Sequence, residues 1–164
     1  MLERHRGIFT GTTPKTTKID NFGSFIPFLG PGDIDDMGNV CYDNKGLSQI
    51  GLQEARKIQP NSILVACIGG IGKSCIVDRE CTCNQQINII APYSCIYFRM
   101  LYYSINSQYF QILMQKNSTG TVIPIINKTL FENLSIPLPP LKEQEYITHT
   151  LDTLFTLTKG LKCE

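Results

Sequence analysis

The chain has 164 residues, of which 42% are hydrophobic and 18% charged, and its formal net charge is +1. This length can bury one sizeable core but is too short for two ordinary domains, so we expect one domain with an appendage. The near-neutral charge excludes attachment to nucleic acid through the overall field, and a nucleic-acid partner would require a local basic face.

The first half of the chain consists of short apolar runs separated by Gly, Pro and Asn. This pattern favours a sheet-rich fold of the mixed α/β (α+β) class. Residues 24–29 are predicted to form a strand that ends in a turn at 30–33, where proline fixes φ and glycine accepts positive φ. Another turn begins at Asp43 and runs to Gly46.

A β-hairpin with a wide loop is predicted in the middle of the chain. Its strands are residues 63–68 and 74–77, and a glycine cluster at 69–72 separates them. Residues 85–91 supply another strand.

Residues 94–115 predict one amphipathic helix packed against the core. Apolar side chains recur every three or four residues, at Tyr97, Leu101, Ile105, Tyr109 and Ile112. The β-branched residues 121–126 then predict a strand, after which Asn127 caps a short helical turn that runs through Glu132.

A second long helix is expected to begin near Leu141, because two prolines precede it and Glu143 and Glu145 suit the positive end of its dipole. It is too short to form a stable coiled coil without a partner or the rest of a longer helix. We therefore divide the chain into a domain at 1–139 and the start of a helix at 140–164. The apolar stripe of this helix, which would otherwise face water, consists of Ile147, Leu151, Leu154, Leu157 and Leu161.

The glycine cluster ends in Gly72-Lys73-Ser74, as a phosphate-binding loop does. Such a loop needs a glycine where Cys67 stands and a helix after it, whereas a strand is predicted here. Two interpretations remain. Either the glycines form a tight hairpin turn with Lys73 solvated, or the backbone N–H groups and Lys73 approach a DNA phosphate.

Seven cysteines, without regular spacing, favour reduced and mostly buried thiols over a disulfide framework. The spacing of Cys81 and Cys83 does not fit a zinc site, and His5 and His149 lie far apart in the sequence, so we expect no metal. The first residues do not resemble a signal peptide, and no run of about 18 apolar residues follows. These features predict a soluble cytoplasmic protein.

The sequence offers no convincing catalytic constellation. Neither a nucleophile motif with a credible base nor an Asn-Pro-Pro-Tyr methyltransferase signature is present. The carboxylates of Asp33, Asp35 and Asp36 lie in a turn, where acidic residues commonly cap and solvate. We therefore predict no enzyme activity and no cofactor.

Several segments, read in order, resemble the target recognition domain of type I restriction-modification specificity subunits. They are residues 11–14 (Gly-Thr-Thr-Pro), 26–27 (Ile-Pro), 31–33 (Pro-Gly-Asp), 51–52 (Gly-Leu), 60–64 (Pro-Asn-Ser-Ile-Leu), 69–73, 84–85 and 136–144. The last run, Ile-Pro-Leu-Pro-Pro-Leu-Lys-Glu-Gln, is the most specific and resembles the start of the family's spacer helix. Two departures are Gly70, where the family has Thr or Ser, and a shorter terminal helix.

The resemblance implies a domain that reads one half of a split double-stranded DNA target. In the family, two such domains are held apart by antiparallel helices, and partner methyltransferase (M) and restriction or translocase (R) subunits perform the chemistry. The chain would then be an excised domain, a truncated product, or a half-subunit that pairs with a copy of itself. The apolar stripe of the last helix would contact another subunit or a partner spacer helix.

This role requires polar loops at base edges and basic side chains at phosphates. The candidate phosphate contacts, which lie in or beside polar loops, are Lys15, Lys18, Lys45, Lys73, Lys116 and Lys128. The candidate polar contacts are Asn84, Gln85, Ser118 and Thr119. A solvated or turn-forming role is the alternative for each, and the Asn84–Gln85 amides could satisfy buried backbone groups.

Two other functions stay open. One is a protein-interaction half-subunit that docks to the methyltransferase without reading DNA. The other is a recognition domain cut from a fused methyltransferase-nuclease.

Overall fold

Four short strands form the central sheet, in the order β1–β7–β4–β5 and with all neighbours antiparallel. The computed structural model describes residues 7–160. The strands are β1 (Gly7–Thr10), β4 (Ile63–Ala66), β5 (Ser74–Ile76) and β7 (Ile87–Ala91). The predicted hairpin of residues 63–77 is therefore confirmed, with β4 ending two residues earlier than expected.

The two faces of the central sheet build two cores, because successive strand residues point to opposite sides. Ile63 and Val65 pack on the side of the helices α2 (Phe98–Asn106), α3 (Gln108–Lys116) and α4 (Lys128–Glu132). Leu64 points the other way, toward a core that it shares with residues of the smaller sheet. Burial on both faces explains why the run of residues 63–66 is entirely apolar.

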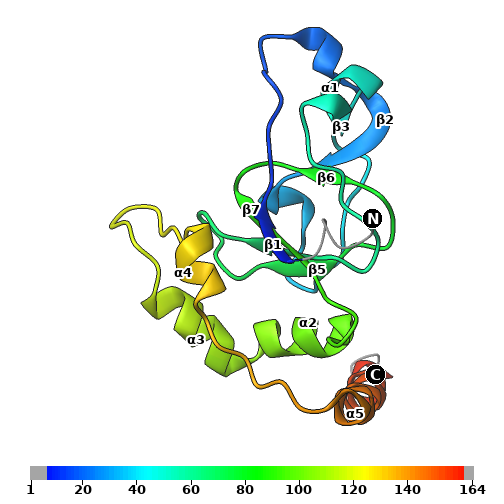
Figure 1. Cartoon of the computed structure of the whole chain (residues 1–164), viewed down its shortest axis with the longest axis vertical. Helices are drawn as coiled ribbons and strands as arrows, with labels where there is room; N and C mark the ends of the chain where they lie inside the picture. The colour runs from blue at the N-terminus through cyan, green and yellow to red at the C-terminus, as the bar shows by residue number, and fades with distance from the viewer. Residues whose placement is uncertain (1–6, 161–164) are drawn as a thin grey trace.

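The smaller sheet has the order β3–β2–β6 and lies beside α1 at one end of the molecule (Figure 1). Its strands are β2 (Phe22–Leu29), β3 (Gly46–Leu47) and β6 (Thr82–Cys83), and α1 spans Gln49–Gln53. Two 3-10 turns, η2 (Ile19–Asn21) and η3 (Pro31–Asp33), flank β2. The strand predicted at 24–29 is confirmed and starts two residues earlier, whereas β1, β3, β6 and α1 were not predicted.

The single helix predicted at 94–115 is wrong: the segment forms two helices, α2 and α3, that meet at Ser107. Ser107 has an extended backbone with ψ 145°, and it ends α2 and caps α3. The break rotates the apolar face, so that Leu101 and Ile105 are buried as predicted while Tyr109 is 65% exposed. Phe110 and Met114 fill the core in place of Tyr109 and Ile112.

The strand predicted at 121–126 is also wrong, because the segment is a loop. Thr119 and Ile125 pair through two backbone hydrogen bonds of 2.7 Å, and Gly120 adopts a φ of +95° between them. The β-branched tip is left in solvent, with Val122 91% exposed. β-branched residues favour a strand only when a neighbouring strand pairs with them, and here Ile125 alone does so, through isolated bridges to Ile68 and Thr119.

The last helix, α5 (Leu141–Gly160), begins at the predicted residue. It lies at the opposite end of the molecule from the smaller sheet and packs along α2 (Figure 1). Asn127 caps α4 as predicted, accepting a hydrogen bond from the Leu130 N–H at 2.9 Å. Over residues 7–160, every helix is too short or too polar to cross a lipid bilayer.

Candidate nucleic-acid interface

Five predicted contacts flank the strands of the smaller sheet. Lys15 and Lys18 precede η2 and β2, and Lys45 directly precedes β3. Asn84 and Gln85 directly follow β6. We call Lys15, Lys18, Lys45, Asn84 and Gln85 the small-sheet group. All three lysines are exposed.

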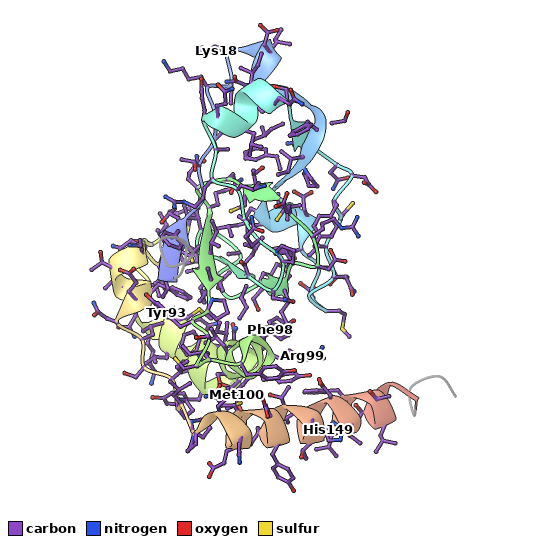
Figure 2. The ribbon with its side chains drawn as sticks, turned by 45° about the vertical axis from the view of Figure 1, so that its right-hand side comes forward. Lys18, Tyr93, Phe98, Arg99, Met100 and His149 are labelled. Atoms are coloured by element: carbon purple, nitrogen blue, oxygen red, sulfur yellow. The ribbon has the colours of Figure 1, made fainter. Side chains whose placement is uncertain are left out.

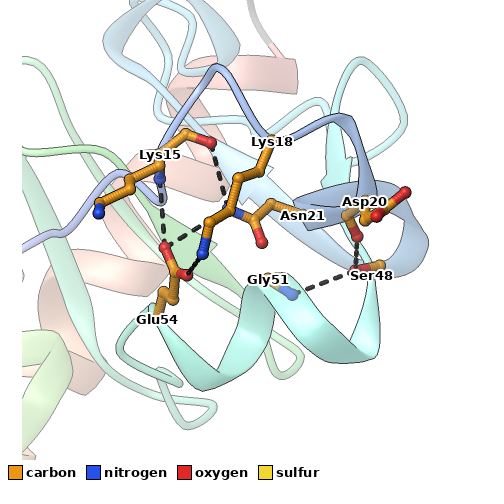
Figure 3. Close-up of polar contacts among 7 residues, drawn as sticks. All are labelled: Lys15, Lys18, Asp20, Asn21, Ser48, Gly51 and Glu54. Carbon is orange, nitrogen blue, oxygen red and sulfur yellow. Dashed lines mark hydrogen bonds and ion pairs between the residues drawn. The ribbon is translucent and has the colours of Figure 1, made fainter.

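Lys15 and Lys18 are positioned by a polar cluster that the sequence did not reveal (Figure 3). The Lys18 ammonium lies 3.1 Å from Glu54 Oε1, and the Lys15 backbone N–H donates to Glu54 Oε2 at 3.3 Å. These interactions hold the pKa of Glu54 below its ordinary value. The buried Asn21 amide donates to the Lys15 carbonyl at 3.1 Å, which fixes the backbone between the two lysines.

Asn84 and Gln85 are held by the segment after β1. The Thr13 hydroxyl donates to Gln85 Oε1, and the Thr12 N–H donates to the Cys83 carbonyl at 3.0 Å. Gly11 passes so close that a Cβ on it would overlap the Asn84 carbonyl oxygen. Two segments of the family resemblance, residues 11–14 and 84–85, therefore meet in space.

The Asn84 side chain serves mainly to shape its own turn. Its Oδ1 accepts the Gln86 N–H at 3.0 Å, and its Nδ2 donates to Gln86 Oε1 at 3.1 Å. The structure therefore favours the turn-forming interpretation for Asn84, whereas Gln85 is exposed.

The other predicted contacts lie around the glycine loop 69–72. The Gly69 N–H donates to the Pro124 carbonyl at 3.1 Å, which joins this loop to the one that follows α3. Gly69 and Gly72 have φ values of +76° and +93°, a conformation that favours glycine. We call the predicted contacts of this region the loop group: Lys73, Lys116, Ser118, Thr119 and Lys128. The strand β5 begins at Ser74, where a P-loop would continue into a helix, so the loop is not a P-loop.

Lys73 is half-buried and already has protein partners. Its ammonium lies 3.2 Å from Asp36 Oδ1 and donates to the Ile34 carbonyl at 3.2 Å. The Asp36 side chain is 90% exposed, and ion pairs that are open to solvent are weak. A phosphate that approached this loop could therefore replace Asp36.

The remaining members of the loop group differ in whether their side chains already have a partner within the protein. The Ser118 hydroxyl donates to the Gln115 carbonyl at 2.7 Å, and the Thr119 hydroxyl donates to the Ile125 carbonyl at 3.3 Å. Lys128 pairs with Glu132 one helical turn away. Within residues 7–160, the ammonium groups of Lys15, Lys45 and Lys116 form no ion pair, so three of the six predicted phosphate contacts are uncommitted.

The acidic turn and the thiols serve the fold. Asp33 accepts the Gly30 N–H at 2.7 Å, and Asp35 accepts two backbone N–H groups at 2.8 Å each. Burial raises the pKa of the Cys75 and Cys81 thiols to about 12, so they stay protonated near neutral pH. Among the residues that the structure describes, no three His, Cys, Asp or Glu side chains converge as a metal site requires.

The inner face of α5 contacts α2 through polar side chains that sequence reasoning missed. Gln144 is 1% exposed, and its Oε1 accepts the Tyr97 N–H at 2.8 Å. Asp152 accepts a hydrogen bond from Arg99 at 2.7 Å and another from the Tyr103 hydroxyl. Burial opposes ionisation of Asp152, but these two hydrogen bonds outweigh it and hold its pKa below the ordinary value.

Only the first half of the predicted apolar stripe of α5 faces the rest of the molecule. Ile147 and Leu151 are half-buried, Leu154 and Leu157 are 52% and 61% exposed, and Leu161 lies outside the described residues. Successive residues turn by about 100°, which places Leu154 and Leu157 roughly 120–180° from the face that α2 covers. The outer half of the stripe is therefore open to solvent.

The two groups of predicted DNA contacts and α5 occupy separate regions of the molecule. Figure 2 shows Lys18 at the end formed by the smaller sheet, while Phe98, Arg99 and Met100 lie near α5 at the opposite end. His149 lies on α5 itself. A partner on the outer face of α5 would therefore leave Lys18 accessible.

A family model described as the type I restriction modification DNA specificity domain matches residues 7–164. The specificity subunit of the type I restriction enzyme EcoR124I/EcoR124II from Escherichia coli is 29% identical over 93% of this chain and 39% of its own length. That of EcoKI from Escherichia coli strain K12 is 25% identical over 94% of this chain and 35% of its own. The chain thus spans a little over a third of the length of these relatives.

Solved structures share the fold. The crystal structure of the HsdS subunit from Thermoanaerobacter tengcongensis superposes with a TM-score of 0.76 at 21% identity, covering 94% of this chain and 36% of that one. A structure described as the basis of assembly and conformational transition of the type I restriction-modification system gives a TM-score of 0.73 at 22% identity. That match covers 94% of this chain and 37% of the other.

Proposed function

Because the chain belongs to the family of type I restriction-modification DNA specificity domains, we propose that it reads one half of a split DNA target. In this role it directs methyltransferase and endonuclease subunits to that sequence and has no catalytic site of its own. The observation that carries the proposal is the family match, which runs over all of the described residues.

The distribution of charge supports this role despite the near-neutral total. Exposed lysines lie in loops at the smaller sheet, and the loop group adds Lys116 at the end of α3 and Lys128 at the start of α4, where local positive charge can meet phosphates. Gln85 is an exposed amide next to the small-sheet lysines, and an amide can read a base edge. The predicted contacts in both groups are retained as candidates, with Asn84 the weakest of them.

The partners follow from the same proposal. Double-stranded DNA is the ligand, and the methyltransferase (M) and restriction (R) subunits supply the chemistry. The outer stripe of α5 contacts the methyltransferase subunit, or pairs with a second recognition domain or a copy of the chain. A protein with this role acts in the cytoplasm, where the DNA of the cell lies.

Replacing Lys73 tests the DNA interface. We expect Lys73→Ala to weaken binding to all sequences and to reduce the slope of log affinity against log salt by about one unit, because one phosphate contact is lost. The measurement is a mobility shift at several salt concentrations with the chain assembled with its methyltransferase partner. Lys57→Ala is the matched control, since Lys57 is an exposed lysine that pairs with Glu80 and belongs to neither group.

Three outcomes separate the alternatives. An unchanged affinity and slope for Lys73→Ala would contradict the role of that lysine. A parent chain that binds the methyltransferase but does not shift DNA would support the interaction-only half-subunit instead. Methyl transfer or DNA cleavage by the isolated chain would overturn the non-catalytic assignment.

A further inference from the structure

The attachment of α5 to the rest of the molecule depends on directional polar contacts at two separate points. At the first point, Gln144 donates from Nε2 to the Pro139 carbonyl at 2.8 Å and to the Cys95 carbonyl at 3.2 Å. Its Oε1 also accepts a hydrogen bond from the backbone N–H of Tyr97, the residue that precedes α2. One buried amide therefore joins the start of α5 to the start of α2.

At the second point, two turns further along, Asp152 binds both Arg99 and Tyr103 of α2. The Phe155 ring stacks on the Tyr103 ring, with centroids 5.4 Å apart and planes inclined by 27°. The Tyr103 side chain therefore contacts α5 twice, through its hydroxyl at Asp152 and its ring at Phe155.

The spacing of the two points determines what they can hold. Eight residues separate Gln144 from Asp152, which is about 12 Å along a helix axis. A single point of attachment would let a helix pivot, and apolar contacts are non-directional, so neither alone would fix an angle. Two directional contacts at this separation restrain both sliding and pivoting of α5 against α2.

We propose that Asp152 is a positioning residue which, together with Gln144, clamps α5 at a fixed angle to the central sheet. The clamp leaves the outer stripe at Leu154 and Leu157 free for a partner. Its consequence for recognition, which rests on the proposed function, is that the DNA-reading end has one orientation relative to that partner. Lys18 lies at the far end of the molecule from α5 (Figure 2), so a small rotation at the clamp becomes a large displacement there.

A distance measurement across the molecule tests the clamp in the full chain. Nitroxide labels are placed at Gln53→Cys in α1 and Thr153→Cys in α5, both exposed positions, after Cys41, Cys95 and Cys163 are replaced by serine. The other four cysteines are buried and will not react under mild conditions. Pulsed electron–electron double resonance then measures the distribution of distances between the labels.

We expect one narrow distribution for the labelled parent and a distribution at least twice as wide for Asp152→Ala. Glu80→Gln, which breaks the exposed Lys57–Glu80 ion pair elsewhere, serves as the control and leaves the width unchanged. A merely stabilising role would lower the melting temperature of Asp152→Ala without widening the distribution in the folded protein. An unchanged width for Asp152→Ala therefore overturns the clamp.

If Asp152→Ala fails to fold, the double variant Arg99→Met, Tyr103→Phe removes both donors and leaves the carboxylate in place. A parental width in that folded variant also overturns the proposal, and a widened one supports it. The distance measurement needs no DNA, so the clamp and the proposed function fail separately: a chain that binds no DNA can still show a narrow distribution.

Discussion

The Gln144 side chain satisfies three backbone groups that would otherwise lack a partner at the junction of α2 and α5. This role gives a physical reason for the specificity of the run 136–144 in the sequence. A side chain with both an acceptor and two donors is required there, and glutamine has them. The apolar stripe alone could not reveal it, because Gln144 is polar, although it stands three residues before Ile147 in the same spacing.

Replacing Gln144 by leucine keeps a similar volume and removes all three hydrogen bonds. The Tyr97 N–H and the Cys95 and Pro139 carbonyls would then lose this partner at the partly buried junction of α2 and α5. We expect Gln144→Leu to lower the free energy of unfolding by about 2–4 kcal/mol, measured by urea denaturation.

The control is Gln115→Leu, at an exposed position on α3, for which we expect a change within about 0.5 kcal/mol. Equal stability of Gln144→Leu and the parent would show that the amide network contributes nothing net.

At the scale of the element, Ser107 decides where one predicted helix becomes two. Its hydroxyl accepts the Phe110 N–H at 3.3 Å and donates to the Ser104 carbonyl at 2.7 Å, so it serves the end of α2 and the start of α3 together. The break turns Phe110 and Met114 toward the central sheet. A serine inside an apolar repeat is compatible with a continuous helix, so this role could not be assigned from the sequence.

We expect Ser107→Ala to destabilise the protein by about 1 kcal/mol, since it removes an N-cap. The measurement is the unfolding midpoint in urea at constant m value. Ser104→Ala is the comparison, because Ser104 lies inside α2 and donates to the Met100 carbonyl without capping a helix. A larger loss for Ser104→Ala than for Ser107→Ala would contradict the capping role.

At the scale of the whole molecule, α5 presents one face to its own domain and another to solvent. The exposed Leu154 and Leu157 contribute little to the core, so changing them should affect association and not folding. We expect the double variant Leu154→Gln, Leu157→Gln to keep the unfolding free energy within about 0.5 kcal/mol of the parent. Retention of the methyltransferase subunit in co-purification should fall at least ten-fold, because truncated apolar anchors lose most of the binding energy.

Glu145→Gln provides the control, since Glu145 is an exposed residue of α5 outside the apolar stripe. Undiminished retention of the partner by the leucine variant would mean that the stripe is not the contact surface. The assignment of Ile147, Leu151 and Leu161 to that surface would then fail as well.

The sequence by itself determined the class of the fold, the hairpin around the glycine loop and the start of α5 at Leu141. These features depend on signals within a few residues: glycines at positive φ, prolines before a helix, and apolar runs of strand length. It also showed the family resemblance, because the matching motifs occur in the same order along the chain as in the family. The strands β3 and β6 gave no such signal, since each has two residues and exists only through its pairing with β2.

Tertiary structure alone decided the break at Ser107, the burial of Gln144 and the face of α5 that meets α2. The last two depend on groups far apart in the sequence, such as Asp152 and the Arg99 and Tyr103 side chains. The break at Ser107 accompanies the packing of Phe110 and Met114 against the central sheet. Apolar periodicity reports which side of a helix avoids water, but it does not report where a neighbouring element will lie. Polar contacts leave no periodic pattern in the sequence. The side of α5 that hydrogen bonds attach to α2 could therefore be identified only from the tertiary structure.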